Sequence, residues 1–210
     1  GRRPNGIYIP RFRNLGGDTD RKDYLRGFGY QGGASRGNWE ETVAELSYGK
    51  DLKESILEPG GWRMGIGGFG EVLPYEDNRM TLDYDKLDDW GLPTVTFDAD
   101  LQENEFKMRK DMQESAVEML EKAGFRDVKG HDGPTGLGLG IHEMGTARMG
   151  RNRKTSVLNG NNQLHDVPNV YVTDGAFMTS ASCVNPSLTY MAFTARAADH
   201  AVKELKKGNI

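Results

Sequence analysis

The run LQENEFKMRKDMQESAVEMLEKA at residues 101–123 predicts the clearest helix of the chain. Its apolar side chains recur at helical spacing and are followed by Gly124, a residue that commonly stands just beyond a helix end. These side chains are Met108, Met112, Ala116, Met119, Leu120 and Ala123. One face of this helix must therefore pack on another element.

The residues ahead of this helix predict strands that the helix can cover. Alternation or β-branched and glycine-rich character marks IYIP at 7–10, YLRGFGY at 24–30, residues 62–82 with a turn at 76–78, and TVTF at 94–97. A short helix is predicted from a cap at Asn38 to a stop at Gly49. We expect an α+β fold in which an antiparallel β-sheet carries packed helices.

The last third of the chain contains three distinct pieces. They are HEMGTARMG at 142–150, the strand-like NVYVTDG at 169–175, and SCVNPSLTYMAFTARAADHAVKEL at 182–205. Pro186 suits the first turn of a terminal helix. A strand, a turn and that helix could return Asn185 beside His142, so that an imidazole and an amide face one cavity.

Composition excludes several classes of protein. The 27 Lys and Arg against 31 Asp and Glu give a net charge of -4, which disfavours nucleic acid and acidic lipid as partners. One Cys and four His without paired cysteines predict no metal site. The uncharged stretch 181–195 is shorter than the roughly 20 apolar residues of a membrane span, so no direct membrane insertion is expected. A periplasmic and a cytoplasmic location both fit this composition.

Two short motifs match known patterns in the wrong setting. GIGGFG at 65–70 has the glycine spacing of a dinucleotide loop, but Pro74 opposes the helix that must follow, so a bend or bulge between strands is predicted. GASRG at 33–37 matches a hydrolase nucleophile motif. Ser35 is predicted to be a loop residue, with a nucleophile activated by His142 or His200 as the alternative.

The three C-terminal pieces together resemble the signature of the glucose-methanol-choline (GMC) flavin oxidoreductases. The resemblance is carried by HEMGTARMG, NVYVTDGAFM and CVNPSLTYMAFTARAADHA. LPYEDNRMTLD and DDWGLPTV resemble parts of the substrate domain of that family, while YIPRFRN and YLRGFGYQGG are most similar to its gluconate and fructose dehydrogenase branch. The resemblance implies a substrate-binding domain at 1–140 and, at 141–210, a segment that contributes to the FAD domain and the active site.

The resemblance also implies the site residues. His142 takes the position of the catalytic base and Asn185 that of the second catalytic residue, which orients the substrate oxygen. Asp174 and Gly175 lie against the ribityl and diphosphate portion of FAD, and Asn185, Pro186 and Thr189 border the edge of the flavin ring. A neutral imidazole, with an unperturbed pKa of about 6.5, is suited to accept an alcohol proton near pH 7. For Asp174, a turn at the end of a strand is an equal alternative, and Cys183 is expected to be a small buried neighbour of Asn185.

The implied reaction is oxidation of an alcohol group of a sugar, polyol or sugar acid, with hydride transfer to flavin. The electron acceptor is not readable from the sequence. Because Gly1 replaces an initiator Met and no strand, glycine loop and helix unit for FAD is present, we expect a C-terminal fragment that is colourless and inactive alone. Trp39, Trp62, Tyr30 and Gln31 are candidates to line a sugar site. A serine hydrolase that uses Ser35 and a noncatalytic carbohydrate-binding or docking module remain as alternatives.

Overall fold

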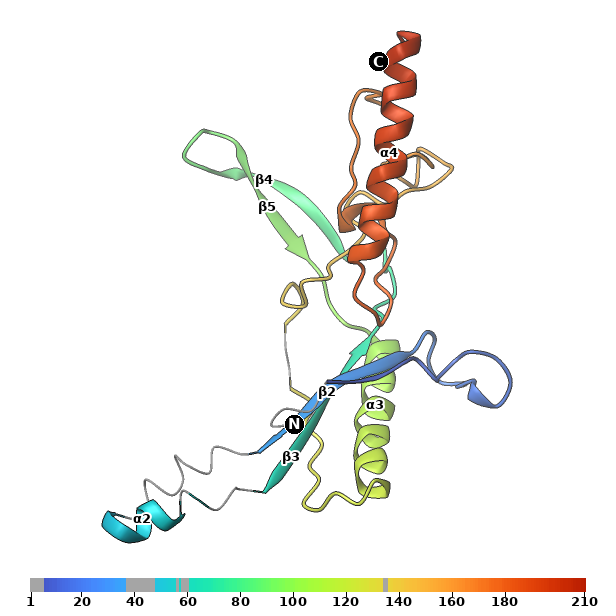
Figure 1. The fold of residues 1–210 in the computed structure, drawn as a ribbon. Coiled ribbons are helices and arrows are strands. Elements are labelled where there is room, and N and C mark those ends of the chain that lie inside the picture. Colours follow the sequence, from blue (N-terminus) through green and yellow to red (C-terminus); the bar gives the residue numbers. More distant parts are fainter. Residues whose placement is uncertain (1–5, 37–47, 56, 58–60, 134–135) are drawn as a thin grey trace.

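Three antiparallel strands form the first sheet (Figure 1). The computed structural model describes residues 6–36, 48–55, 57, 61–133 and 136–210. The strands lie in the order β1-β2-β3 and are β1 (Ile7–Ile9), β2 (Phe28–Arg36) and β3 (Trp62–Gly70). β2 and β3 pair without a break, from Phe28 opposite Gly70 to Arg36 opposite Trp62. The expected antiparallel sheet is thus present, although β2 begins later in the chain than the YLRGFGY pattern predicted.

Helix α3 (Glu103–Lys122) lies against β3, as the helical spacing of its methionines predicted. Tyr24, Phe28, Tyr30 and Met108 are buried and form the core between the helix and the sheet. The helix begins where the Glu105 carboxylate accepts a hydrogen bond from the backbone N–H of Gln102, and it ends before Gly124, whose φ is 89°. Its bounds fall within two residues of the predicted ones, because local residues set both ends: Glu105 in the first turn and Gly124 after the last turn.

The GIGGFG motif lies inside β3, so the predicted bend or bulge is wrong. Each of its residues pairs with β2 in continuous register, and no helix opens after it. At Gly68 and Gly70 the absence of a side chain lets α3 pack close to this strand. A Cβ at Gly70 would lie 2.7 Å from the Met108 Cε.

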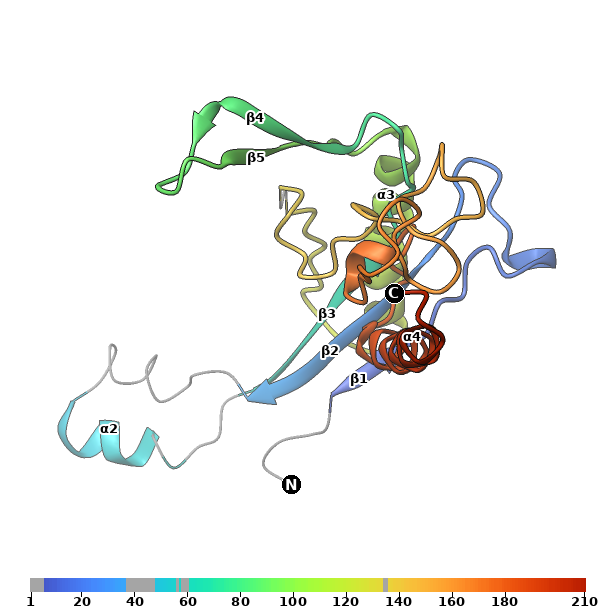
Figure 2. The ribbon, with the colours of Figure 1, turned by 90° about the horizontal axis from the view of Figure 1, so that it is seen from above.

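Strands β4 (Arg79–Leu87) and β5 (Pro93–Asp98) form a separate two-stranded hairpin, which corrects the expectation of a single sheet. Figure 2 shows it standing away from β1, β2 and β3. Its two faces differ in polarity. One carries the cross-strand pairs Leu82 with Val95 and Met80 with Phe97, and the other pairs Thr81 with Thr96.

Among the described residues, two short helical elements lie between the strands of the first sheet. A 3-10 turn, η1 (Gly17–Thr19), follows β1, and α2 (Gly49–Ser55) lies between β2 and β3. Gly49 opens α2 and has a φ of 69°, and the helix predicted to stop there lies, through residue 47, outside the described residues. The predicted cap at Asn38 lies outside the described residues.

The C-terminal third is mostly loop, packed against a long helix. It contains the 3-10 turn η2 (Gly175–Phe177) and α4 (Ser187–Lys207). The ring of Phe177 stacks on Phe193 of α4 with centroids 4.7 Å apart. The strand predicted at 169–175 is reduced to one bridge, Tyr171 with Gln163. A strand needs neighbours, and the described chain supplies this one with a single pairing residue.

The described elements leave much apolar surface uncovered. The chain has an accessible surface of 15279 Å². A compact monomer of its mass, 23.3 kDa, has about 9,700 Å². Tyr84 and Phe97 of the hairpin are 73% and 68% exposed. The alternating pattern of the hairpin therefore makes an apolar face that nothing in the described chain covers.

Candidate functional site

The three C-terminal motifs converge in space. The backbone N–H of Ala147 donates to the carbonyl of Ala176 (3.0 Å), and that of Met149 donates to Phe177 (2.9 Å). The first turns of α4 join them where the Tyr190 hydroxyl donates to the Met144 Sδ (3.5 Å). The segment 142–150, the segment 174–180 and the start of α4 therefore form one cluster, called here the C-terminal cluster.

Gly175 lies at the centre of this cluster. A Cβ at this position would stand 2.8 Å from the Met144 Sδ, 2.9 Å from the Tyr190 Oη and 3.1 Å from the Glu143 carbonyl oxygen. The protein itself therefore requires glycine here. This packing explains the glycine without a ligand. The contact of Gly175 with flavin remains a prediction.

His142 is half-buried at the edge of the cluster. The turn before it is fixed by Glu143, whose Oε1 accepts a hydrogen bond from the backbone N–H of Gly140 (2.8 Å). Glu143 thus has a structural role in this turn. Within the described part of the chain the imidazole of His142 makes no hydrogen bond, so both of its nitrogens can serve a ligand.

Asn185 is exposed just before α4. Pro186, the helix cap, and Cys183 are both buried, and they anchor the backbone on either side of Asn185. Burial of Cys183 confirms its predicted place in the interior. The carboxamide of Asn185 has no hydrogen-bond partner among the residues that the structure describes.

The start of α4 is suited to electron-rich groups. Its first turn contains no acidic side chain, and the N-terminus of a helix favours negative charge. Thr189 is half-buried on that first turn. Asn185, Pro186 and Thr189 thus share one helix end, as the motif predicted.

The segment of His142 contacts the segment of Asn185 through Met144 and Tyr190, two residues that the sequence analysis did not predict as part of the site. Met144 follows His142 by two positions, and Tyr190 follows Asn185 by five. The contact between Met144 and Tyr190 brings these segments together, while across the described ranges no hydrogen bond links the His142 and Asn185 side chains themselves. The place of Tyr190, one turn into a helix that starts after Asn185, was the signal that could have identified it.

Asp174 has a structural duty at the entrance to η2. Its Oδ1 accepts a hydrogen bond from the backbone N–H of Ala176 (2.9 Å), which confirms the turn role that the sequence left open. Its carboxylate is exposed. Burial raises the pKa of the Tyr190 hydroxyl, and the nearby charges of Asp174 and Glu143 raise it further, so that this hydroxyl stays protonated.

The other sequence candidates lie apart from the cluster. Ser35 is a strand residue of β2 opposite Arg63, so the loop position predicted for it is wrong, and it does not occupy a strand-to-helix turn of the kind a hydrolase nucleophile needs. The Nδ1 of His200 is 3.0 Å from the Tyr171 hydroxyl.

The residues predicted to line a sugar site differ in their exposure to solvent. Tyr30 is buried and donates its hydroxyl hydrogen to the Met112 carbonyl (2.6 Å), so its predicted place in a sugar site is wrong. Trp62 is exposed beside Arg36, and Gln31 lies in mid-strand. Trp39 lies outside the described residues.

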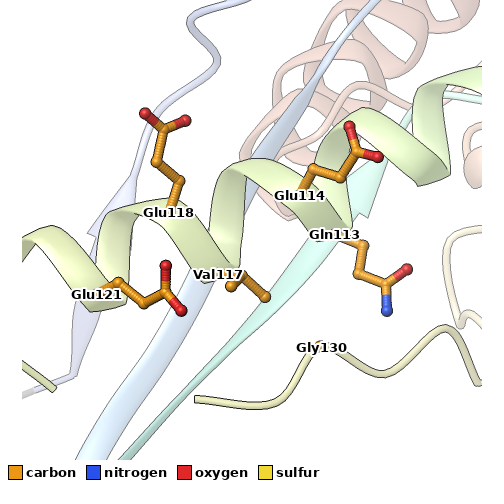
Figure 3. Close-up of a pocket in the computed structure, with 6 residues that line it drawn as sticks. All are labelled: Gln113, Glu114, Val117, Glu118, Glu121 and Gly130. Carbon is orange, nitrogen blue, oxygen red and sulfur yellow. The ribbon is translucent and has the colours of Figure 1, made fainter. Parts of the chain in front are cut away.

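The hollows on the described surface include two open ones. One of about 360 Å³ is lined by Gln113, Glu114, Val117, Glu118, Glu121 and Gly130 (Figure 3). Figure 3 shows Glu114 and Glu118 pointing away from Gly130. The hollow lies beside α3 and contains none of the predicted site residues. The other, of about 280 Å³, borders the C-terminal cluster at Gly145 and Thr146 and carries Arg148, Arg153 and Lys154.

Two further features bear on function. Over the described ranges, no group of His, Cys, Asp and Glu side chains has the arrangement needed to hold a metal ion. None of the helices in those same ranges is both long enough and apolar enough to cross a bilayer.

Comparison with known proteins places the chain in a family. The model described as GMC oxidoreductase matches residues 74–194. The 2-methyl-1,2-propanediol dehydrogenase of Mycolicibacterium austroafricanum is 34% identical over 188 residues, which are 87% of this chain and 34% of that protein. The chain therefore spans about a third of the length of this relative.

Two more relatives belong to the branch that the sequence resembles. The fructose dehydrogenase large subunit of Gluconobacter japonicus is 29% identical over 76% of this chain and 29% of its own length. The gluconate 2-dehydrogenase flavoprotein of Pantoea cypripedii is 26% identical over 70% of this chain and 25% of its own length. Because the family model covers more than half of the 210 residues, the chain belongs to the GMC oxidoreductase family, as its C-terminal motifs predicted.

Proposed function

We propose that this chain carries the proton-accepting and substrate-orienting residues of an FAD-dependent enzyme that oxidises an alcohol group of a sugar, polyol or sugar acid. The observation that supports this most is the C-terminal cluster, which brings the segments of His142 and Asn185 together while leaving both side chains free of hydrogen-bond partners in the described chain. Residues 1–140 act as the substrate-binding domain. Residues 141–210 contribute to the FAD domain and the active site.

The residues present fit a flavin. Asn185 offers an exposed amide at the start of α4, and the helix end there lacks an acidic side chain. Asn185, Pro186 and Thr189 would border the ring edge, while Asp174 and Gly175 would lie along the ribityl and diphosphate portion. The exposed carboxylate of Asp174 has a second oxygen that its own turn does not use. When bound, FAD supplies the acceptor for the hydride.

His142 accepts the hydroxyl proton of the substrate. An alcohol carbon releases hydride readily only if the oxygen proton leaves with it, and a neutral imidazole nitrogen is a suitable base near neutral pH. The half-buried position of His142 limits water around the ring. Because its nitrogens have no partner in the described chain, no hydrogen bond has to break before the proton is taken.

Asn185 orients the substrate. Its amide N–H donates a hydrogen bond to the substrate oxygen, which fixes the reacting carbon in a near-attack position. The buried residues on both sides, Cys183 and Pro186, restrict movement of its backbone. This rigidity keeps the amide at one distance from the oxygen.

The proposed substrate class is taken from the names of the relatives. They are named for a diol, for fructose and for gluconate, which are all small hydroxyl-bearing molecules. We propose a substrate of the same chemical kind. The relatives include proteins named dehydrogenase and others named oxidase, so the electron acceptor is not part of the proposal.

The proposal is tested by following flavin reduction without oxygen in the full-length protein. His142→Ala should slow flavin reduction by on the order of 10²- to 10⁴-fold, the usual contribution of a positioned base, while FAD stays bound. The matched control is His131→Ala, which removes an exposed imidazole at a loop position and should leave the rate unchanged. An unchanged rate in His142→Ala would remove His142 from the mechanism.

A further inference from the structure

Glu71 joins the strand-bearing part of the chain to the C-terminal cluster. It directly follows β3, and its side chain is 11% exposed. Its Oε1 accepts a hydrogen bond from the Ser180 hydroxyl at 2.6 Å, across 109 positions of sequence. A short hydrogen bond to a nearly buried carboxylate is among the stronger polar contacts in a protein.

The carboxylate of Glu71 is itself held in place. The Nε of Arg26 lies 3.5 Å from the same Oε1, and the backbone N–H of Glu71 donates to the Gly27 carbonyl. Arg26 has a φ of 69°, a left-handed conformation that is uncommon for a residue with a side chain. The Asn14 amide donates to the Arg26 carbonyl and holds this backbone. The position of Glu71 is thus fixed by its neighbours. Through Ser180 it holds the loop at residues 178–185, called here the Ser180 loop.

The Ser180 loop contacts the segments of both proposed active-site residues. Ser180 precedes Asn185 by five positions in a stretch whose backbone is pinned by buried Cys183. On its other side the loop packs on Gly145, three positions after His142. A Cβ at Gly145 would lie 3.3 Å from the Thr179 carbonyl oxygen and 3.5 Å from that of Met178. A shift of this loop would move both segments.

We propose that Glu71 is a positioning residue for the His142 and Asn185 pair and acts through its hydrogen bond to Ser180. The inference rests on the proposed function, since it concerns the geometry of that site. Near-attack geometry tolerates little error, and a displacement of about 1 Å can cost on the order of 10²-fold in rate. The bond between Glu71 and Ser180 sets where the loop lies relative to the sheet, and therefore where the substrate oxygen meets His142 and Asn185.

The test uses the full-length enzyme and the variant Ser180→Ala, which removes one hydroxyl and adds no bulk. Stopped-flow reduction of the flavin separates the limiting reduction rate from the substrate dissociation constant. We expect the limiting rate to fall on the order of 10- to 100-fold with flavin content unchanged. Ser180→Thr keeps the hydroxyl and should restore most of the rate.

The matched control is Ser115→Ala. Ser115 of α3 also donates its hydroxyl hydrogen to a carboxylate, that of Asp111 at 3.0 Å, and it is buried outside the cluster. Its loss removes a hydroxyl that donates to Asp111 and accepts from the Arg13 Nη2 (3.0 Å), and it leaves the Ser180 loop untouched. The reduction rate should stay at the wild-type value in this control.

A second measurement needs no turnover. Amide hydrogen exchange in the flavin-free full-length protein should become faster across residues 178–185 in Ser180→Ala and remain unchanged there in Ser115→Ala. The inference is overturned if Ser180→Ala reduces flavin at the wild-type rate, or if Ser115→Ala slows reduction as much. Failure of the proposed function looks different, because the wild-type enzyme itself would then show no flavin reduction by any alcohol.

Discussion

Gly68 of β3 lies directly beneath Met112 of α3, and a Cβ at position 68 would stand 2.0 Å from the Met112 Sδ and 2.5 Å from its Cγ. The helix can approach the sheet only because residue 68 has no side chain. This closeness also lets the buried Tyr30 hydroxyl reach the Met112 carbonyl. Gly68 is therefore part of the helix–sheet interface.

Gly68→Ala should destabilise the fold. The new methyl group must displace the Met112 stem as well as its tip, and overpacking of this kind costs about 1–3 kcal/mol in the free energy of unfolding. Denaturant unfolding measures the loss. Gly65→Ala is the matched control, because it changes the same strand at a place where a Cβ would meet nothing within 4 Å. An equal loss in both variants would contradict the close packing of α3 on Gly68.

Much of the strand-bearing part of the fold could be predicted from the sequence. The error at GIGGFG shows what local sequence patterns do not reveal. Helix 101–123 and the turn at 76–78 depend on local signals, and both are observed. The role of Gly68 depends on Met112, which is 44 positions away, and no local pattern carries that information. The separation of β4 and β5 from the first sheet is likewise a question of long-range pairing.

The Asp111 carboxylate should make stability depend on acid pH. Burial alone would raise its pKa, but hydrogen bonds from Arg13, Tyr24, Arg21 and Ser115 outweigh that effect and lower the pKa from 3.8 to about 2. The unfolded chain therefore binds a proton more readily than the folded one in this range. The stabilisation, about 2 kcal/mol, is complete above about pH 5 and is lost progressively as the pH falls through 4 toward about 2.

The measurement is the free energy of unfolding as a function of pH. Asp111→Asn should flatten the curve between about pH 5 and 2, since the titrating group is gone. Glu118→Gln removes an exposed partner of Lys122 and should change the curve much less, because solvent screens that pair. A wild-type slope retained in Asp111→Asn would show that Asp111 does not link folding to protonation here.

Gly175→Ala should disturb the C-terminal cluster. The added methyl group would meet Met144, Tyr190 and the carbonyl of Glu143, so either the His142 segment or α4 must move. We expect a loss of about 1–3 kcal/mol in the free energy of unfolding and slower flavin reduction in the full-length protein. Gly160→Ala is the control, because a Cβ there would meet nothing within 4 Å. Wild-type stability and wild-type reduction in Gly175→Ala would contradict the packing described for the cluster.

The candidate site was predictable as a set of segments and not as a set of contacts. The motifs predicted His142 and Asn185 as site residues, and the contact between Met144 and Tyr190 brings their segments together. The hydrogen bond between Glu71 and Ser180 had no sequence signature, because a carboxylate after a strand and a serine in a loop are common in proteins. The strand expected at 169–175 failed for a physical reason, since strand pairing depends on partners and the described chain offers it one bridge.

The apolar face of the β4–β5 hairpin leads to the last prediction. Met80, Leu82, Val95 and Phe97 lie on one face with between 43% and 68% of their surfaces exposed, and the opposite face carries Thr81 paired with Thr96. Strict alternation of this kind is typical of a sheet with one buried face. The 210-residue chain should therefore bind a hydrophobic dye and fluoresce with it.

Phe97→Thr should lower that dye fluorescence several-fold, because it removes a ring that is 68% exposed on this face while threonine keeps a high β-propensity. Thr96→Ser changes the polar face of the same strand and should leave the fluorescence as it was. In the full-length protein the wild-type signal should also be low if the face is covered there. Equal fluorescence of the wild-type chain and Phe97→Thr would mean that the dye binds elsewhere and that this face is not the principal exposed apolar surface.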